Sequence, residues 1–194
     1  MQKLNREDLF TLEKYAEVRP EFRARVMAHK KNRQLRIGPD ATLYFEDALT
    51  MQYQIQEMLR IERIFEAAGI QEELDAYNPL IPDGSNWKAT FMLEYPDEEI
   101  RRVQLQKLLG IERHIWAQVA DFARVTPVAD EDLEREDDEK TSSVHFLRFE
   151  LTAEMAEAVR NGAAVSMGID HPAYTHAAEP IAQNIRDSLA QDLG

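Results

Sequence analysis

The segment Gln34–Glu46, with the sequence QLRIGPDATLYFE, predicts a β-hairpin in the first quarter of the chain. Two short runs, Gln34–Ile37 and Thr42–Glu46, flank the triplet Gly38–Asp40. Glycine and proline followed by an acidic residue are typical of turns, and strands joined by a short turn pair in antiparallel fashion. The hairpin therefore favours an antiparallel or mixed sheet.

Further strands are predicted on both sides of the middle of the chain. Trp87–Tyr95 and Ser143–Leu151 place apolar side chains at every second position, and Ala164–Ile169 is a short apolar run. His114–Val128 is expected to be one long extended segment. Helices are expected over the amphipathic segments: two N-terminal helices, the second opening at Pro20, then Asp47–Phe65, Glu72–Tyr77, Asp97–Leu109, Thr152–Asn161 and Ala177–Leu193.

These elements do not alternate one strand with one helix. We therefore predict an α+β fold, with a mixed or antiparallel sheet of about six strands and helices packed on it. The 194 residues contain no repeat and no linker, which predicts a single domain over residues 1–194.

The composition excludes several classes of site. The chain has no cysteine, so disulfides, thiolate zinc sites, cysteine-ligated iron–sulfur clusters and a cysteine nucleophile are excluded. Residues 1–15 mix charged and apolar residues, unlike a signal peptide, and no apolar run approaches the roughly 18 residues of a membrane span. We therefore expect a cytoplasmic protein without a membrane partner.

The net charge of −13 is unevenly distributed. Residues 130–139, which we call the acidic segment, contain eight acids and one arginine, and residues 19–36, the basic segment, contain seven bases and one glutamate. An acidic chain repels nucleic acid, so we expect no nucleic-acid partner. The basic segment is either a solvated helix face or a surface that meets acidic groups, in this chain or in a partner. The acidic segment predicts an extended, exposed loop.

Glu62 breaks the apolar pattern of its predicted helix. Helical spacing places it at the centre of a stripe of apolar residues. A carboxylate that faces a core needs a partner or takes a raised pKa. A salt bridge to a buried arginine and a helix end that lifts Glu62 into solvent are structural explanations, and a metal ligand or a general acid/base is the functional one.

Three other residues complete a candidate metal site. His145 lies on an apolar strand face, Glu150 lies on the same strand, and His171 follows Asp170 at a strand end. Together with Glu62, they form a carboxylate and histidine set that suits a divalent metal. The structural alternatives are a hydrogen-bonded core histidine, an ion pair of Glu150 with Arg148, and an incidental turn residue. The motifs GxGxxG, GxxxxGK[ST], GxSxG and HExxH are absent, so no reaction class follows from a motif.

Long strings of the sequence resemble a known family. They are Met51–Phe65 (MQYQIQEMLRIERIF), Glu72–Gly84 (EELDAYNPLIPDG), Thr141–Leu151 (TSSVHFLRFEL) and Gly162–Tyr174 (GAAVSMGIDHPAY). The chain resembles domain of unknown function family 3501, a bacterial family of about this length. The resemblance implies an association with rubrerythrin-type and heterodisulfide-reductase-like iron–sulfur proteins encoded nearby, and hence a role in defence against oxidative stress.

Three functional hypotheses follow. The first is an accessory protein that docks an iron–sulfur or di-iron redox protein by charge, through the acidic and basic segments. The second is a metal-binding protein or an enzyme with a carboxylate and histidine site, and the third is a homo-oligomer with a structural or regulatory role.

Overall fold

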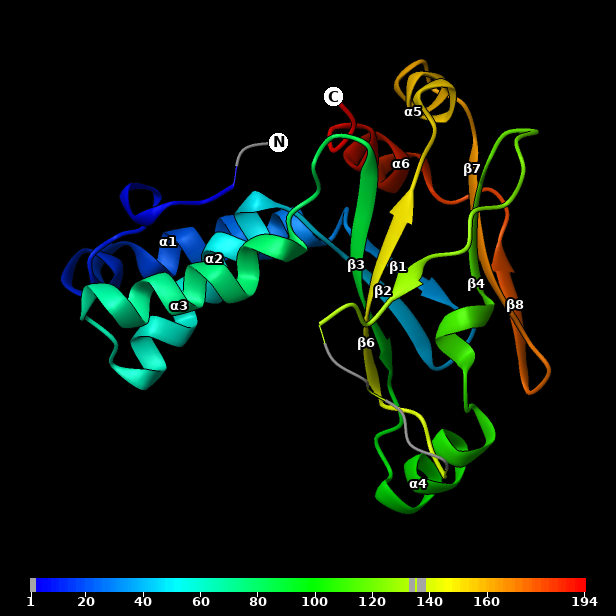
Figure 1. The fold of residues 1–194 in the computed structure, drawn as a ribbon, viewed down its shortest axis with the longest axis horizontal. Coiled ribbons are helices and arrows are strands. Elements are labelled where there is room, and N and C mark those ends of the chain that lie inside the picture. Colours follow the sequence, from blue (N-terminus) through cyan, green and yellow to red (C-terminus); the bar gives the residue numbers. More distant parts are fainter. Residues whose placement is uncertain (1–2, 133–134, 136–138) are drawn as a thin grey trace.

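The computed structural model describes residues 3–132, 135 and 139–194, and it has an α+β fold (Figure 1). These residues form six α-helices and eight strands, and every strand pair is antiparallel. The predicted fold class is therefore confirmed. The strands lie in two sheets of five and three strands, where the sequence pattern suggested one sheet of about six.

The five-stranded sheet has the order β1-β2-β3-β6-β5. Its strands are β1 (Gln34–Ile37), β2 (Ala41–Glu46), β3 (Asn86–Leu93), β5 (Val128–Ala129) and β6 (Val144–Glu150). The predicted hairpin is confirmed, since Ile37 pairs with Ala41 across a turn in which Gly38 has a φ of 73°. Glycine suits this turn because other residues rarely adopt positive φ.

The three-stranded sheet has the order β4-β7-β8, with β4 (Ile115–Val119), β7 (Val165–His171) and β8 (Tyr174–Ala178). Two expectations about this region are wrong. The extended segment 114–128 is interrupted after β4, where Ala120 takes a φ of 41°. The chain then returns from β7 as β8, so the last helix begins at Gln183 and not at Ala177.

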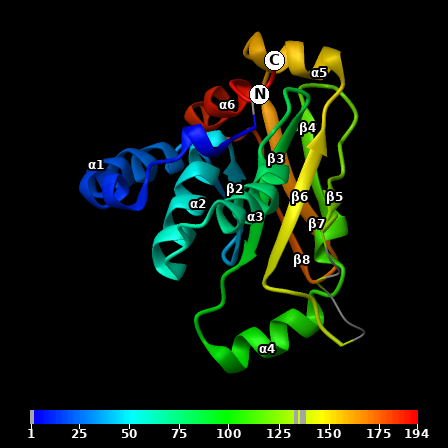
Figure 2. The same ribbon diagram turned by 60° about the vertical axis from the view of Figure 1, so that its left-hand side comes forward.

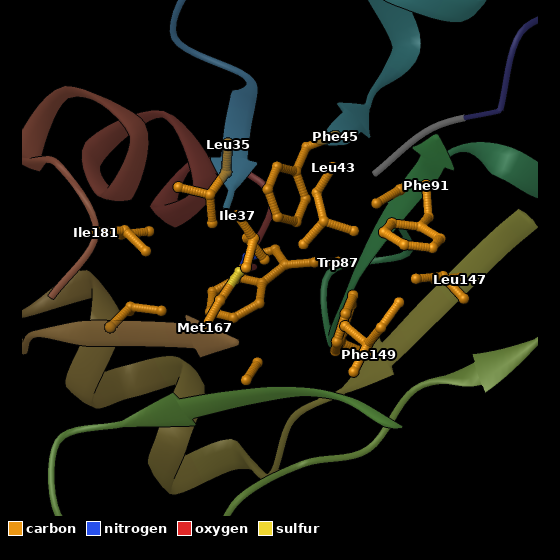
Figure 3. Close-up of a cluster of buried hydrophobic side chains, with 14 of the residues drawn as sticks. Leu35, Ile37, Leu43, Phe45, Trp87, Phe91, Leu147, Phe149, Met167 and Ile181 are labelled. Carbon is orange, nitrogen blue, oxygen red and sulfur yellow. The ribbon is translucent and has the colours of Figure 1, made fainter. Parts of the chain in front are cut away.

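One apolar core lies between the two sheets. Side chains at alternate positions of β3 and β6, such as Trp87 and Phe149, point toward Met167 of the smaller sheet (Figure 3). The apolar face predicted for Trp87–Tyr95 packs in this core, and in Ser143–Leu151 the buried face is the one that carries His145, Leu147 and Phe149. Figure 2 shows the two sheets from the side, with the opposite face of the larger sheet turned toward the first three helices. That outer face is where the candidate site lies.

The helices are in three places around the sheets (Figures 1 and 2). Three pack together beside the larger sheet, α4 lies at one end of the sheets, and two lie at the other end. Their bounds, with the 3₁₀ turns, are η1 (Arg6–Asp8), α1 (Leu12–Lys30), α2 (Ala48–Glu62), α3 (Ala67–Tyr77), η2 (Asn78–Leu80), α4 (Glu98–Lys107), η3 (Ile111–His114), α5 (Ala153–Arg160) and α6 (Gln183–Ala190). Within the described residues, none of these helices has the length and apolar character needed to cross a membrane.

Pro20 does not start a second helix, because α1 continues through it. A proline inside a helix removes one backbone hydrogen bond, to the carbonyl four residues earlier. Here that residue is Ala16, and both Ala16 and Pro20 are exposed, so the freed carbonyl lies on the solvent side of the helix. The basic segment therefore begins inside one continuous helix.

Arg33 belongs to the basic segment but is buried, with 2% of its side chain exposed. Its Nη2 atom lies 2.5 Å from Asp192 Oδ2, and its Nε atom lies 3.2 Å from Asp47 Oδ2. It also donates to the backbone carbonyls of Phe45 and Glu46. One cation thus ties the C-terminal end of the chain to the larger sheet.

Asp192 gives the first testable prediction, on the pH dependence of stability. Burial raises the pKa of Asp192 to about 6, and the nearby Asp47 carboxylate acts in the same direction, whereas Arg33 and His29 lower it. Between about pH 4, the ordinary aspartate pKa, and pH 6 the folded chain binds a proton that the unfolded chain releases. We therefore expect the unfolding free energy of the native protein, relative to Asp192→Asn, to fall as the pH rises from 4.5 to 7.5.

Urea denaturation of both proteins across this pH range measures the difference. The exposed Asp187 supplies a control, since Asp187→Asn removes a carboxylate without a buried partner. A difference that stays constant or grows with pH contradicts the prediction.

Candidate docking groove

A groove runs between the α3–η2 connection and the outer face of β3 and β6. Its cavity volume is about 540 Å³, within the range of ligand-binding pockets. The lining residues come from three parts of the chain: Asp75, Ala76, Tyr77, Pro79, Leu80, Lys88, Glu131, Asp132, Phe146, Leu147 and Arg148. Helix, sheet and acidic segment therefore meet at one place.

The two-residue repeat of the strands determines which side chains enter the groove. Because Leu147 and Phe149 point into the core, Phe146 and Arg148 point to the opposite face of β6. Lys88 lies directly across from Arg148 in the β3–β6 pairing. On the other wall, Pro79 and Leu80 follow α3, whose helix ends just before the proline. Aromatic and aliphatic groups thus form the floor, and charged groups stand around it.

Ion pairs and hydrogen bonds engage both cations of the groove. Arg148 makes a bidentate pair with Glu131, with Nε–Oε2 and Nη2–Oε1 distances of 2.7 and 2.8 Å, and it also contacts Glu150. The hydrogen bond from Arg148 lowers the pKa of Glu131, and the two carboxylates raise the pKa of Arg148. Lys88 donates to the carbonyl of Pro79, and burial lowers its pKa.

Two further carboxylates, Asp75 and Asp132, lie on the rim, and the rest of the acidic segment follows directly in the sequence. Residues 133, 134 and 136–138 of this segment lie outside the described residues. For them the extended loop stays a prediction from the sequence. The described lining has three carboxylates and two cations, and Arg135 adds a cation at the edge, since its guanidinium lies over the Phe146 ring and contacts Asp132.

A triplet of side chains, Thr141, His145 and Asp130, anchors the start of the acidic segment, and the first two are buried. His145 Nδ1 donates to Asp130 Oδ2 over 2.6 Å, and His145 Nε2 lies 2.9 Å from the hydroxyl oxygen of Thr141. Asp130 also accepts a hydrogen bond from the backbone of Phe146, and its own φ is 51°. These contacts direct the next residue, Glu131, to Arg148 in the groove.

The order Asp130–His145–Thr141 resembles a catalytic triad, but the burial of its members opposes that interpretation. Thr141 is 1% exposed and His145 is 0% exposed, so the hydroxyl is closed to a substrate. The geometry identifies His145 as a hydrogen-bonded core histidine. The strand pattern around His145 indicated this alternative, but it carries no signal for Asp130, which lies 15 residues away.

Glu62 does not face the core, because the helix that carries it ends there. The helix α2 ends at Glu62, because Arg63 takes a left-handed conformation with a φ of 57°. Glu62 is therefore exposed at the end of the helix, which is the second structural explanation given above. The predicted helix continued to Phe65, and those additional residues made the apolar stripe look complete.

The other predicted metal ligands are also apart from one another. His145 points into the core, whereas Glu150 lies on the opposite face of the same strand and contacts Arg148 and Asn86. His171 lies in the smaller sheet, where its ring nitrogens contact the backbone of Leu109 and Ala173. Of the residues that the structure describes, no group of three or more acids and histidines is placed to hold a metal ion. The predicted convergence of the four residues is thus absent from the geometry.

The comparisons with known proteins identify the family. A model of the family "Protein of unknown function (DUF3501)" matches residues 3–193, so the chain belongs to this family, as the sequence resemblance indicated. The crystal structure of a Burkholderia pseudomallei K96243 protein, described as a novel protein of unknown function, is 53% identical, covers 100% of both chains and has a TM-score of 0.94. No curated protein matches the chain.

Proposed function

We propose that this chain is an accessory protein that docks a redox partner, a rubrerythrin-like or iron–sulfur protein acting in oxidative-stress defence, through the acidic groove. The observation that carries the proposal is a groove in which Leu80 and Phe146 lie beside the carboxylates of Asp75, Glu131 and Asp132. Two of these carboxylates contact arginines of the chain itself, Glu131 with Arg148 and Asp132 with Arg135, so a cationic partner would have to compete for them. The complementary occupant is a partner segment in which lysines or arginines flank apolar side chains.

The position of the acidic segment supports this assignment. A loop held only by its ends must lose conformational entropy when a partner binds. The Asp130–His145 and Glu131–Arg148 contacts fix the beginning of the segment before any partner arrives. The groove thus holds Glu131 in a fixed position, where a cationic partner surface would compete with Arg148 for its carboxylate.

The composition indicates which of the two proteins would hold the metal centre. The chain has no cysteine with which to ligate an iron–sulfur cluster, so in this proposal the cluster or di-iron centre belongs to the partner. The basic segment contributes less to docking than its charge suggests. Arg33 is buried, and Arg19 pairs with Glu57 at 2.7 Å within the helical layer.

The second prediction concerns the groove itself. We expect Leu80→Glu, which puts a carboxylate on the apolar floor, to weaken binding of the partner about tenfold or more, because an unpaired charge would be buried in the complex. Asp132→Lys reverses a rim charge and is expected to slow association and to reduce the salt dependence of binding. Titration calorimetry with the rubrerythrin-type and iron–sulfur proteins of the same organism, at low and high salt, measures both effects.

Glu157→Lys is the matched control, because Glu157 is an exposed acid on α5, away from the groove. The control should bind like the native chain. If neither redox protein binds at low salt, or if Glu157→Lys weakens binding as much as Asp132→Lys, the proposed function is wrong.

A further inference from the structure

A second surface lies on the helical layer, at the turn between α2 and α3. The side chains of Ile61 and Phe65 are 62% and 63% exposed there, the two highest values among the large apolar residues found exposed. Single exposed apolar residues are common, but neighbouring ones beside a cavity mark an interaction site. The left-handed Arg63 ends α2 and turns the chain, so that Phe65 projects from the surface.

A cavity of about 300 Å³ opens directly beside this projection. Its walls are mostly aliphatic and aromatic side chains from η1, α1, α2 and α3, and Phe65 itself forms part of the edge: Arg6, Leu9, Phe10, Thr11, Leu12, Glu13, Leu59, Ile64, Phe65 and Ile70. A projecting ring and an apolar cavity thus share one patch, which we call the Phe65 patch (residues 60–66 with the cavity lining). Figure 1 shows the turn between α2 and α3 at the end of the helical layer remote from the sheets.

This pairing of projection and cavity fits a two-fold symmetric contact. In such a contact the same patch of two copies meets face to face, so each copy must present both complementary shapes. Phe65 of one copy then enters the cavity of the other, and the reverse insertion follows by symmetry. A surface that binds an unrelated partner needs only one of the two shapes, the projecting ring or the cavity.

The charges around the patch also suit a second copy. Residues 60–66 contain two arginines and two glutamates, and the cavity lining adds Arg6 and Glu13, so cations and anions are equal in number. The whole chain carries −13, and most other approaches of two copies bring like charges together. At the Phe65 patch, opposite charges can pair across the two-fold axis.

We propose that the Phe65 patch is a homodimer interface, in which Phe65 of each copy occupies the apolar cavity of the other. The interface is separate from the docking groove, so the dimer keeps two grooves accessible. Because its contacts are mainly apolar, the dimer persists at high salt, whereas docking in the groove weakens.

Analytical ultracentrifugation over a concentration series tests the proposal. The native chain is expected to form a dimer as concentration rises, in low and in high salt, and Phe65→Asp is expected to shift the equilibrium toward monomer by about 100-fold, because two charges would enter apolar cavities. Ile100→Asp is the control, since Ile100 on α4 is a similarly exposed apolar residue at 53%. Circular dichroism verifies that each variant is folded.

The absence of native cysteine permits an independent measurement. Ile61→Cys introduces the only thiol of the chain, and we expect it to form disulfide-linked dimers under mild oxidation faster than Ile100→Cys does. A monomeric native chain at high concentration, or dimers that Phe65→Asp leaves intact, would overturn the proposal. So would a Phe65→Asp variant that loses only its binding to the redox partner, since the patch would then belong to that partner.

Discussion

Replacing Arg33 by leucine is expected to lower the free energy of unfolding by about 3–5 kcal/mol, the cost of leaving a buried charge without its partner. Arg33 is 2% exposed and its guanidinium contacts Asp192 and Asp47. Leucine would leave the buried Asp192 without its cation, and Asp47 would keep only its contact with His29. The carbonyls of Phe45 and Glu46 would also lose a donor. Urea denaturation at pH 7 measures the loss.

A double variant of Arg33 and Asp192 tests whether removal of both charges restores stability. Arg33→Met combined with Asp192→Leu removes both charges, and apolar replacements of a buried ion pair are commonly neutral or stabilising. We therefore expect the double variant to be more stable than Arg33→Leu. Arg23→Leu is the control from the exposed part of the basic segment and should change stability by no more than about 0.5 kcal/mol. A loss below about 1 kcal/mol for Arg33→Leu contradicts the buried ion pair.

His145→Ala has the second largest expected effect, a loss of about 2–4 kcal/mol of stability from the cavity and from two broken hydrogen bonds. His145 is fully buried between Thr141 and Asp130, so both partners would lose a hydrogen bond in the interior. Because Glu131 follows Asp130, we also expect the first carboxylate of the groove to lose its fixed position. Denaturation and partner titration on the same variant measure the two effects.

His114→Ala serves as the control, since His114 is exposed and lies outside the triplet. Should His145→Ala destabilise the fold but leave partner binding unchanged, the anchor would be structural only. An unchanged stability would contradict the hydrogen-bonded triplet itself.

The alternation of apolar residues was sufficient to predict two strands of the larger sheet, β3 and β6. At Trp87–Tyr95 and Ser143–Leu151, one side of each strand packs into the core, so burial imposes a strict repeat on the sequence. The turn Gly38–Asp40 likewise required residues suited to a reversal of the chain. Burial of one strand face and the geometry of the turn restrict the residues at these positions, so the sequence there predicts the structure.

The smaller sheet lacked such signals. Three consecutive residues of β8, Thr175–Ala177, are exposed, so its sequence carries little apolar repeat, and the segment looked like the start of the following helix. Its position comes from pairing with β7, a tertiary contact that residue patterns do not report.

The candidate site was harder to predict because its contacts join distant parts of the chain. His145 and Arg148 looked unusual in the sequence, but their partners Asp130 and Glu131 were hidden among eight acids of similar appearance. Glu62 was placed within an apolar stripe because the predicted helix extended to Phe65, whereas α2 ends at Glu62. Arg33 looked like any other base of the basic segment until its burial was known.

Nuclear magnetic resonance mapping of the docking surface tests the central claim most directly. The chain of 22.4 kDa suits this method. On titration with the unlabelled redox partner at low salt, we predict the largest shift changes at the methyl groups of Leu80 and the ring of Phe146, on the groove floor. Shift changes confined to other surfaces, with Leu80 and Phe146 unaffected at saturation, would contradict docking in the acidic groove.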